Sequence, residues 1–455
     1  MIARLGAALA RWCSRWVPDP FVLALGLTLL VFAIGASMLV GQGAELGDAF
    51  WDLTLSWAGF IDDETGKTRG GLANPGGLAF ALQMCLVLVT GHAMALSPPV
   101  QRAIRALAQL PRSAGAATVM VALVACAAAL VHWGLGAIAG ALLAREIGRY
   151  GAERGLRVHY PLLGAAAYSG MAVWHGGLSG SAPLKVAEAG QVGLEATLGS
   201  QLNLVVSAAM VITIAVCYWL LTPKQPAELI PPDPNQLAPL PERTQQPVDS
   251  AVAWLQESPW VGRTVGAAIL AWLAAALATG NRELEINSVN LGFFCIGLLL
   301  QGSLRHYTSA IADGARGAGA IILQFPLYFG ILGMMKASGI VAAISTWFAD
   351  IASASSFPVL TYASAGIVNL LVPSGGGQWA VQSEILLGAG QSLGVDPAVT
   401  IMAFSYGDAW TNMLQPFWAL PLLGIMGLKA RDIIGYTAVV FIALGVVTAG
   451  LLVAL

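Results

Sequence analysis

The sequence predicts an all-α polytopic membrane protein with inverted-topology repeats, two re-entrant hairpins and two broken transmembrane helices. Of the 455 residues, 57% are hydrophobic and only 10% are charged, whereas soluble proteins carry about 25% charged residues. Apolar runs of about 20 residues, the length of a membrane-spanning helix, recur along the whole chain. Two further apolar stretches, 115–144 and 358–385, are interrupted by glycine clusters, which disfavour one continuous helix.

The composition also excludes several classes of protein. The net charge is −2 and there is no basic stripe, so nucleic acid is not an expected partner. The five cysteines are scattered and no CxxC occurs, which argues against a metal cluster or a disulfide framework. The glycine-rich segments lack a Walker lysine, and no nucleophile motif lies in a strand–turn–helix context. We therefore expect a protein that is not an enzyme and that has no cofactor.

Residues 1–20 predict an amphipathic helix that lies on the inner surface of the membrane. No small-residue cleavage site follows a short apolar stretch here, so a signal peptide fits less well. The basic and aromatic residues at helical spacing are Arg4, Arg11, Trp12, Arg15 and Trp16.

Nine stretches have the length and apolarity of a membrane span. They are 21–42, 72–97, 160–185, 200–222, 262–280, 288–304, 317–337, 397–422 and 433–455. Two of them, 160–185 and 397–422, contain Gly, Pro, Ser, Thr and Asn near their centres, and we expect these to be the broken helices.

The distribution of Lys and Arg indicates which connections face the cytoplasm. The arginines of the N-terminus, of 98–114 and of 145–158 place all three on the inside, whereas the acid-rich loop 43–71 suits the outside. Both ends of 115–144 then lie on one side, so this stretch is predicted to enter from the cytoplasm and return. The same reasoning makes 358–385 a hairpin entered from outside, with the C-terminus periplasmic.

The chain divides into two predicted repeats, 21–222 and 288–455, separated by a Pro-rich cytoplasmic linker (223–258) and a connecting transmembrane helix (259–287). The separation from Gln83 to Val131 equals that from Gln324 to Val372, 48 residues in each case. The connecting helix inverts the second repeat, and inverted repeats place substrate sites at discontinuous helices near the bilayer midplane. Chance similarity between apolar segments is the alternative explanation of the spacing.

The candidate site is formed by the hairpin tips 132–136 and 374–379 and by the helix breaks 174–181 and 407–416. Exposed backbone N–H groups at a half-helix start attract anions, and free carbonyls can coordinate Na⁺. This chemistry suits a small carboxylate, although small residues also serve helix packing. The predicted substrate-binding residues are His132, Gly134, His175, Gly176, Ser179, Ser181, Ser374, Gly375, Gly376, Gly377, Trp379, Thr411 and Asn412.

Asp408 is the most informative charge, because an acid inside a membrane segment is by default functional. We expect Asp408, with His175 and Asn412, to bind the coupling ion, either H⁺ or Na⁺, with Na⁺ placed near Ser374 and Asn412. No resident metal is expected. A purely structural hydrogen bond is the alternative role for Asp408, as a buried structural histidine is for His175.

Three long motifs resemble the short-chain fatty acid transporter family, the AtoE-type acetoacetate and butyrate permeases. They are VPSGGGQW (372–379), WHGGLSGSAPL (174–184) and MLQPFWALPLLGI (413–425), supported by PDPF at 18–21. The resemblance runs from residue 16 to residue 436. It implies a bacterial inner-membrane transporter related to a superfamily of homodimeric, elevator-type carriers. In this family position 132 is often Asn and position 175 can be Gly, so His at both positions leaves the substrate preference open.

The predicted function is cation-coupled transport of short-chain fatty acid anions, such as acetoacetate or butyrate, with the N-terminus cytoplasmic. A dicarboxylate carrier or an ion exchanger of the same superfamily is the first alternative. It would call for a second cationic cluster, for which Lys185 and Arg145 are candidates although both lie near span ends. The second alternative is a membrane sensor or scaffold that does not transport.

Overall fold

A computed structural model describes residues 8–9, 12, 15, 20–61, 68–69, 71–72, 75–237, 248–282, 286–371, 375–415 and 417–454. The described chain is helical almost throughout, as predicted. Most of residues 1–20 lie outside the described residues, so the amphipathic helix stays a prediction. The elements that precede the linker are α2 (Pro20–Gly41), α3 (Leu46–Ala58), α4 (Pro75–Ala95), α5 (Pro98–Ala108), α6 (Ala114–Val131), α7 (Trp133–Arg154), α8 (Tyr160–Tyr168), η1 (Ser169–Ala172), η2 (Trp174–Gly176), α9 (Ser181–Glu188) and α10 (Gln201–Leu221).

The linker and the second half follow the same helical pattern. Their elements are η3 (Pro226–Glu228), η4 (Pro234–Leu237), α11 (Ala251–Glu257), α12 (Pro259–Ala278), α13 (Ile286–Gln301), α14 (Leu304–Ala315), η5 (Arg316–Ala318), α15 (Gly319–Ala337), α16 (Ile340–Asp350), α17 (Phe357–Leu371), α18 (Gly375–Ser392), α19 (Pro397–Thr411), η6 (Asn412–Leu414), η7 (Phe417–Ala419), α20 (Leu420–Met426) and α21 (Ala430–Ala454). The strands of the described chain are two-residue segments, β1 (Phe60–Ile61) and β2 (Thr68–Arg69), paired antiparallel.

Five helices are long and apolar enough to cross a membrane: Ala24–Gly41, Ala114–Val131, Gln201–Leu221, Pro259–Ala278 and Ala430–Ala454. Two bent pairs pass the same test as units, α4 with α5 at 75° and α14–η5 with α15 at 45°. The protein is therefore a multi-pass membrane protein. The predicted spans 160–185 and 397–422 are each divided into shorter pieces, which are the broken helices that the sequence predicts.

Helix α3 is a departure from the sequence prediction, which placed a loop over 43–71. Ala49 and Leu53 lie one helical turn apart and are both fully buried, and α3 packs against α2 and α15. Asp48 and Asp52 of the same helix are exposed. The amphipathic pattern is short and interrupted by acids, so composition alone indicated an external loop.

The first hairpin reverses direction at a single residue, His132. Its backbone is extended (φ −159°, ψ 129°) between α6 and α7, and the two helices then pack against each other. A Cβ on Gly136 would lie 2.5 Å from the Cβ of Ala129 and 2.8 Å from the carbonyl oxygen of Ala125. Glycine therefore permits the close approach of α7 to α6, and α7 extends ten residues beyond the predicted end of the hairpin.

The second hairpin joins α17 to α18 through residues that lie outside the described part of the chain, Val372 to Ser374. Two buried glutamines of α18 connect the helices: Gln378 Nε2 donates to the Ala365 carbonyl oxygen at 2.7 Å, and Gln382 Nε2 donates to Ser364 Oγ at 3.2 Å. Hydrogen bonds from side-chain amides hold helices together inside a membrane, where water does not satisfy polar groups.

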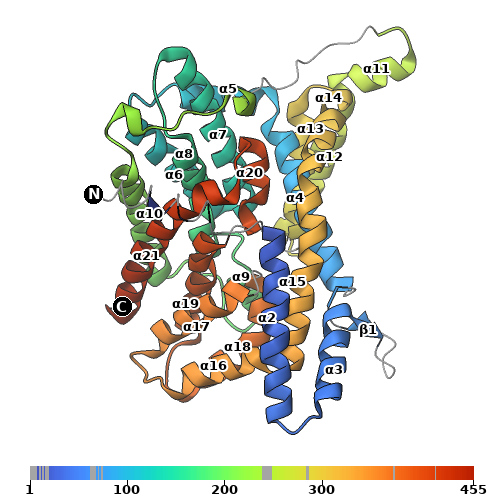
Figure 1. The fold of residues 1–455 in the computed structure, drawn as a ribbon. Helices are drawn as coiled ribbons and strands as arrows, with labels where there is room; N and C mark the ends of the chain where they lie inside the picture. The colour runs from blue at the N-terminus through green and yellow to red at the C-terminus, as the bar shows by residue number, and fades with distance from the viewer. Residues whose placement is uncertain are drawn as a thin grey trace.

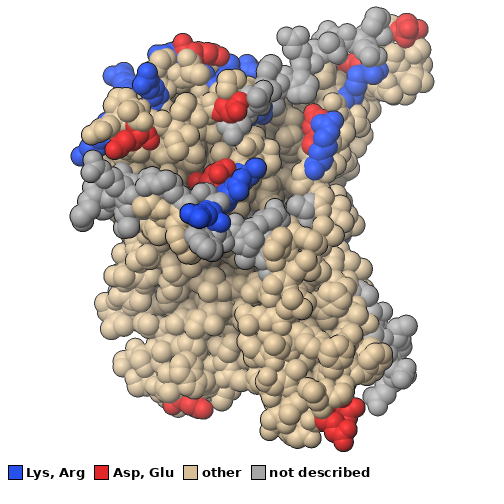
Figure 2. Space-filling model, in the orientation of Figure 1, with Lys and Arg blue, Asp and Glu red and all other residues tan. Residues whose placement is uncertain are grey.

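The two hairpins occupy opposite ends of the molecule. Figure 1 shows α6, α7 and α8 in the upper part of the view, and α16, α17 and α18 in the lower part. On the face drawn in Figure 2, the described Lys and Arg gather in the upper half, whereas the described charged residues visible at the lower end are Asp and Glu. This placement matches hairpins that enter from opposite sides; the repeat boundaries themselves stay a prediction.

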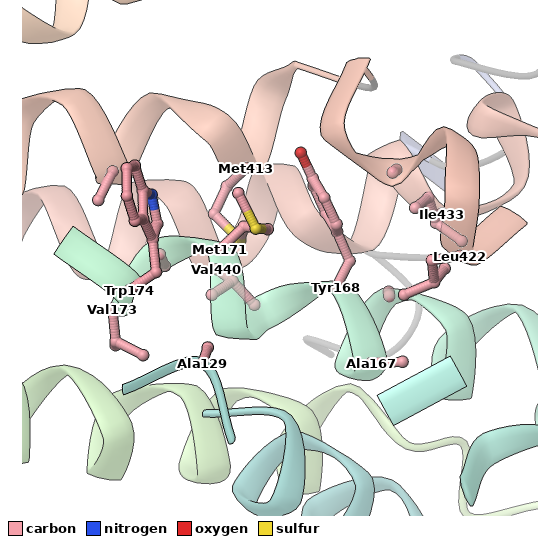
Figure 3. Packing of buried hydrophobic residues seen from close by; sticks show 14 of the residues in the cluster. Ala129, Ala167, Tyr168, Met171, Val173, Trp174, Met413, Leu422, Ile433 and Val440 are labelled. Carbon is pink, nitrogen blue, oxygen red and sulfur yellow. The ribbon is translucent and has the colours of Figure 1, made fainter. Parts of the chain in front are cut away.

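The broken helices pack against each other in the interior. Figure 3 shows Met171 of the first break and Met413 of the second close together, with Tyr168 and Trp174 on either side. Each of these side chains is less than one-tenth exposed and belongs to the largest hydrophobic cluster. The apolar core thus fixes both breaks in the middle of the fold.

Candidate functional site

The first helix break depends on glycine because its backbone lies directly against hairpin 1. A Cβ on Gly177 would lie 2.2 Å from the carbonyl oxygen of Leu130, the penultimate residue of α6. The next residue, Leu178, donates its backbone N–H to that same oxygen at 2.7 Å. A Cβ on Gly180 would lie 2.4 Å from the His175 carbonyl oxygen. A helical conformation is therefore replaced by two 3₁₀ turns and a short extended segment before α9.

Ser179 has a structural partner in this arrangement. Its Oγ accepts the backbone N–H of Trp133 at 3.1 Å, one of the N–H groups at the start of α7 that no carbonyl of the helix satisfies. The first break and the tip of hairpin 1 are thus held together by two hydrogen bonds.

The second break is bonded to the first through its own polar residues. Asn412 Nδ2 donates to the Met171 carbonyl oxygen at 3.2 Å, and Tyr168 Oη donates to the Gln415 carbonyl oxygen at 2.8 Å. Gln415 Nε2 in turn donates to the carbonyl oxygens of Asn369 and Leu370 near the end of α17. Backbone carbonyls that the breaks leave unpaired are therefore satisfied by side chains of the opposite break.

His175 and Asp408 form the centre of the site. His175 Nδ1 lies 2.9 Å from Asp408 Oδ2, and the two residues are 0% and 1% exposed. The backbone N–H of Ala182 donates to His175 Nε2 at 3.1 Å, so Nε2 carries no proton. The ring proton therefore lies on Nδ1 and is donated to Asp408. The second carboxylate oxygen, Oδ1, is buried without a hydrogen-bond partner among the described residues.

The glycine start of α18 lies directly beside this pair. A Cβ on Gly375 would lie 2.8 Å from His175 Cε1 and 3.3 Å from Asp408 Oδ2. The positive end of the α18 dipole therefore faces a carboxylate. Lys185 of α9 donates from Nζ to the Gly376 carbonyl oxygen at 2.9 Å, which adds a second positive group at the tip of hairpin 2.

Oxygen atoms of three residues converge on one amide beside Asp408. Asn369 Nδ2 lies 2.8 Å from the Asp408 carbonyl oxygen, 2.9 Å from Thr411 Oγ1 and 3.0 Å from Asn412 Oδ1. An amide nitrogen has only two protons for these three acceptors, and Asn369 Oδ1 is itself buried without a described partner. A flipped amide would add a fourth oxygen to the group, and oxygen donors are the ligands that hard cations prefer.

Asn203 of α10 anchors the first break from the opposite side. Its Nδ2 donates to the carbonyl oxygens of Gly176 and Leu198, and its Oδ1 accepts the hydroxyl of Tyr406 at 3.1 Å. Because Tyr406 lies two residues before Asp408 on α19, this bond ties the position of the carboxylate to that of the first break.

The structure brings together most of the predicted site residues. His175, Gly375, Gly376, Ser181 and Asp408 surround the tip of hairpin 2, where a Cβ on Gly376 would lie 3.6 Å from Ser181 Cβ. Thr411 and Asn412 lie in the adjoining oxygen cluster. Gly176 accepts a hydrogen bond from Asn203, and Gly377 follows in the first turn of α18. Ser374 lies outside the described residues.

Two groups of predicted site residues, His132 with Gly134 and Trp379, have surroundings other than the His175–Asp408 pair. His132 accepts the Gly134 N–H on its Nδ1 at 3.2 Å, and its ring lies edge-on to Phe293 of α13 at 5.4 Å. A Cβ on Gly134 would lie 2.4 Å from Val87. Trp379 is packed edge-on against Phe404 at 4.9 Å. Among the described residues, no hydrogen bond joins His132 or Trp379 to the His175–Asp408 pair.

Sequence reasoning missed Asn203 and Asn369 as parts of the site. It named Lys185 only as a candidate for a second cationic cluster, and Trp174 lies within the predicted break 174–181. Trp174 is 6% exposed, stacks on the His175 ring with centroids 4.3 Å apart, and has an Nε1–H without a described partner. A single Asn inside each of the apolar runs 358–371 and 201–221 is a signal that could have indicated Asn369 and Asn203, because isolated amides in membrane helices are expensive.

Two solved structures match the chain over most of its length, with low similarity scores. The YdaH transporter of Alcanivorax borkumensis matches with a TM-score of 0.46 and 15% identity, covering 95% of this chain and 98% of that one. MtrF of Neisseria gonorrhoeae, described as one of a class of antimetabolite efflux pumps, matches with a TM-score of 0.35 and 15% identity over 97% and 96% of the chains. Both scores are low, so the family assignment rests on sequence relatives.

Sequence comparison gives a full-length match. A sequence model of the family described as short chain fatty acid transporter covers residues 1–455. Relatives from Escherichia coli strain K12 and Haemophilus influenzae are 36% and 33% identical, over 98% and 97% of this chain and 98% of each relative. Both are named, provisionally, as short-chain fatty acid transporters. The predictions of family and of a non-enzymatic protein are thus confirmed: the chain belongs to the short-chain fatty acid transporter family.

Proposed function

We propose that the protein is a cation-coupled secondary transporter of short-chain fatty acid anions, such as acetoacetate or butyrate, in the bacterial inner membrane. The observation that carries the proposal is the buried His175–Asp408 pair at the point where both helix breaks meet the glycine start of α18. An acid at this position can take up a cation only when the surrounding elements open, which is the requirement for coupling a cation to a solute.

The coupling cation binds at Asp408, and His175 positions the carboxylate. A second proton on the imidazole would occupy Nε2 and remove the acceptor of the Ala182 N–H, so His175 is poorly suited to carry the proton itself. Asp408 Oδ1, which has no hydrogen-bond partner among the described residues, can bind either H⁺ or Na⁺. For Na⁺, the oxygen cluster around Asn369, with Thr411 and Asn412, supplies further ligands.

The substrate carboxylate binds at the start of α18, where backbone N–H groups and the Lys185 ammonium supply positive charge. The hydroxyl of Ser181 adds a directed donor. Ser179 and Thr411 already have hydrogen-bond partners, so their hydroxyls are secondary candidates. Trp174 forms the apolar wall for the acyl chain, because a Cβ on Gly375 would lie 3.3 Å from its ring.

Uptake of labelled butyrate and acetoacetate into liposomes that contain the purified protein tests the function. We expect saturable uptake driven by an inward H⁺ or Na⁺ gradient, and comparison of the two gradients identifies the ion. Lys185 favours a dicarboxylate carrier as the second candidate, since an ammonium beside a helix start suits two carboxylates. Succinate that competes fully with butyrate would support that candidate, and absence of saturable uptake of any short acid would exclude the proposed function.

The 3-oxo group of acetoacetate is recognised by the indole N–H of Trp174, which is buried and has no described partner. The change Trp174→Phe keeps the ring against His175 and removes this donor. We expect kcat/KM for acetoacetate to fall about three- to ten-fold, the size of one hydrogen bond, while the value for butyrate changes less than about two-fold. Measurement of both uptake rates in the same liposomes checks this.

A matched control for this change is Trp57→Phe on α3, which removes another buried indole N–H without a described partner. Trp57 packs against Gly330 of α15, away from the site, so the ratio of the two rates is expected to stay at the wild-type value. Equal losses for acetoacetate and butyrate in Trp174→Phe would contradict a role in recognising the oxo group.

Movement of the hairpins and the breaks as one body accounts for alternating access. Both breaks and hairpin 1 are joined by hydrogen bonds, whereas α7 meets α4 through the small residues Gly134 and Gly91. In an elevator motion of a homodimer, this body would slide along the interface between α7 and α4, which is smoother than the hydrogen-bonded contacts because small residues form it. We assign the basic end in Figure 2 to the cytoplasm by the positive-inside rule, and we propose that the N-terminus lies inside and the C-terminus in the periplasm.

A further inference from the structure

A cavity of about 730 Å³ lies far from the His175–Asp408 pair, at the ends of α6 and α10. Its walls come from the first residues of α6, from the turn 155–157 after α7 and from the segment 222–229 that begins the linker. The volume is typical of a site for a small molecule or a lipid headgroup. Nothing in the transport mechanism proposed above uses it.

The lining of the cavity is cationic. It includes Arg157 and Lys224 and no carboxylate, and neither cation forms an ion pair with a residue in the described part of the chain. Ala114 and Gly115 at the start of α6 also face it. Ser113 caps only the Ala116 N–H, so other N–H groups of this first turn are available to an anion.

The cavity lies where two candidate membrane spans end. The candidate spans Ala114–Val131 and Gln201–Leu221 both have one end at its wall. Trp219, 57% exposed, lies in the lining, and its ring is 3.1 Å from where a Cβ on Gly115 would stand. Tryptophan is enriched at membrane interfaces, where its ring contacts acyl chains and headgroups. Leu156 and Leu229 add apolar surface beside the two cations.

We propose that this cavity binds the anionic phosphate group of a membrane phospholipid, with Arg157 and Lys224 on the phosphate oxygens and Trp219 against the glycerol and upper acyl chain. Basic pockets between transmembrane helices on the cytoplasmic side suit such headgroups, and the planar guanidinium of arginine matches phosphate geometry. Because the walls belong to hairpin 1, α10 and the linker, a bound lipid would connect the start of the linker to the hairpin.

The experiment compares the purified full-length protein with the double variant Arg157→Gln/Lys224→Gln in neutral detergent. Thermal unfolding is followed while phosphatidylglycerol, zwitterionic phosphatidylcholine or soluble glycerol 3-phosphate is added. We expect phosphatidylglycerol to raise Tm of the wild type, and the double variant to need an about ten-fold or higher concentration for the same shift, given two lost basic contacts. The matched control is Arg105→Gln/Lys429→Gln, which removes the same two residue types at exposed positions outside the cavity.

Each outcome decides the proposal. A phosphatidylglycerol effect that is lost in the cavity variant and kept in the control supports a lipid site. A shift with glycerol 3-phosphate that the cavity variant loses supports the phosphate site and assigns it to a soluble phosphate ester. Equal losses in the two double variants would mean attraction to general surface charge and overturn the proposal, as would a wild type that responds equally to phosphatidylcholine.

Discussion

Replacing Asp408 with Asn is expected to abolish gradient-driven accumulation of the substrate while the protein stays folded. The Asn side-chain oxygen can still accept the proton of His175 Nδ1, so the geometry of the pair is kept. What is lost is the negative charge and Oδ1, which has no described hydrogen-bond partner and is the atom at which a cation can bind. Symport of one anion with one cation is electroneutral, so a ten-fold cation gradient supports at most about ten-fold accumulation. In Asp408→Asn this ratio is expected to fall to about 1.

The measurement is the steady-state ratio of labelled butyrate inside and outside liposomes under an imposed H⁺ or Na⁺ gradient. Asp396→Asn is the matched control, because Asp396 is the N-cap residue of the same helix, α19, and its carboxylate accepts the Ala398 N–H at 2.8 Å. Asn caps helices as well as Asp does, so this variant is expected to accumulate substrate like the wild type. Undiminished accumulation by Asp408→Asn would show that the cation binds elsewhere.

The sequence predicts the hairpins and breaks well because glycine clusters inside apolar runs permit few other structures. The break at His132 and the glycine start of α18 lie within the predicted tips 132–136 and 374–379. In a membrane, backbone groups that leave a helix must find partners inside the protein, so the same pattern also implies that polar side chains gather at these points.

The pairing of specific residues could not be predicted in the same way. Asp408 and His175 are 233 residues apart. The residues around each of them give no indication that the two side chains form a pair. Lys185 looked like a residue at the end of a span, but the break before α9 turns that helix so that Nζ reaches Gly376. Conversely, His132 appeared equivalent to a site residue, whereas the close packing of Gly134 on Val87 directs it to the interface with α4 and α13.

Gly177→Ala is expected to have the second largest effect, through the contact between hairpin 1 and the first break. The new Cβ would lie 2.2 Å from the Leu130 carbonyl oxygen and 2.5 Å from Leu130 Cα. Both are backbone atoms, so neither can move aside as a flexible side chain could. Overpacking of this kind costs about 1–3 kcal/mol. It would also separate the N–H of Leu178 from the Leu130 oxygen that it bonds.

The functional consequence should exceed the loss of stability, because the first break positions His175 against Asp408. A displacement of about 1 Å at a site can reduce rates by about 100-fold, so we expect uptake to fall at least about ten-fold with Tm lowered by several degrees. Gly424→Ala on α20 is the matched control, since a Cβ there meets nothing within 4 Å and Ala favours the helix. Normal uptake by Gly177→Ala at an unchanged Tm would mean that hairpin 1 and the first break are not held in contact. The two breaks would then be coupled through their own hydrogen bonds, from Asn412 to the Met171 carbonyl and from Tyr168 to the Gln415 carbonyl.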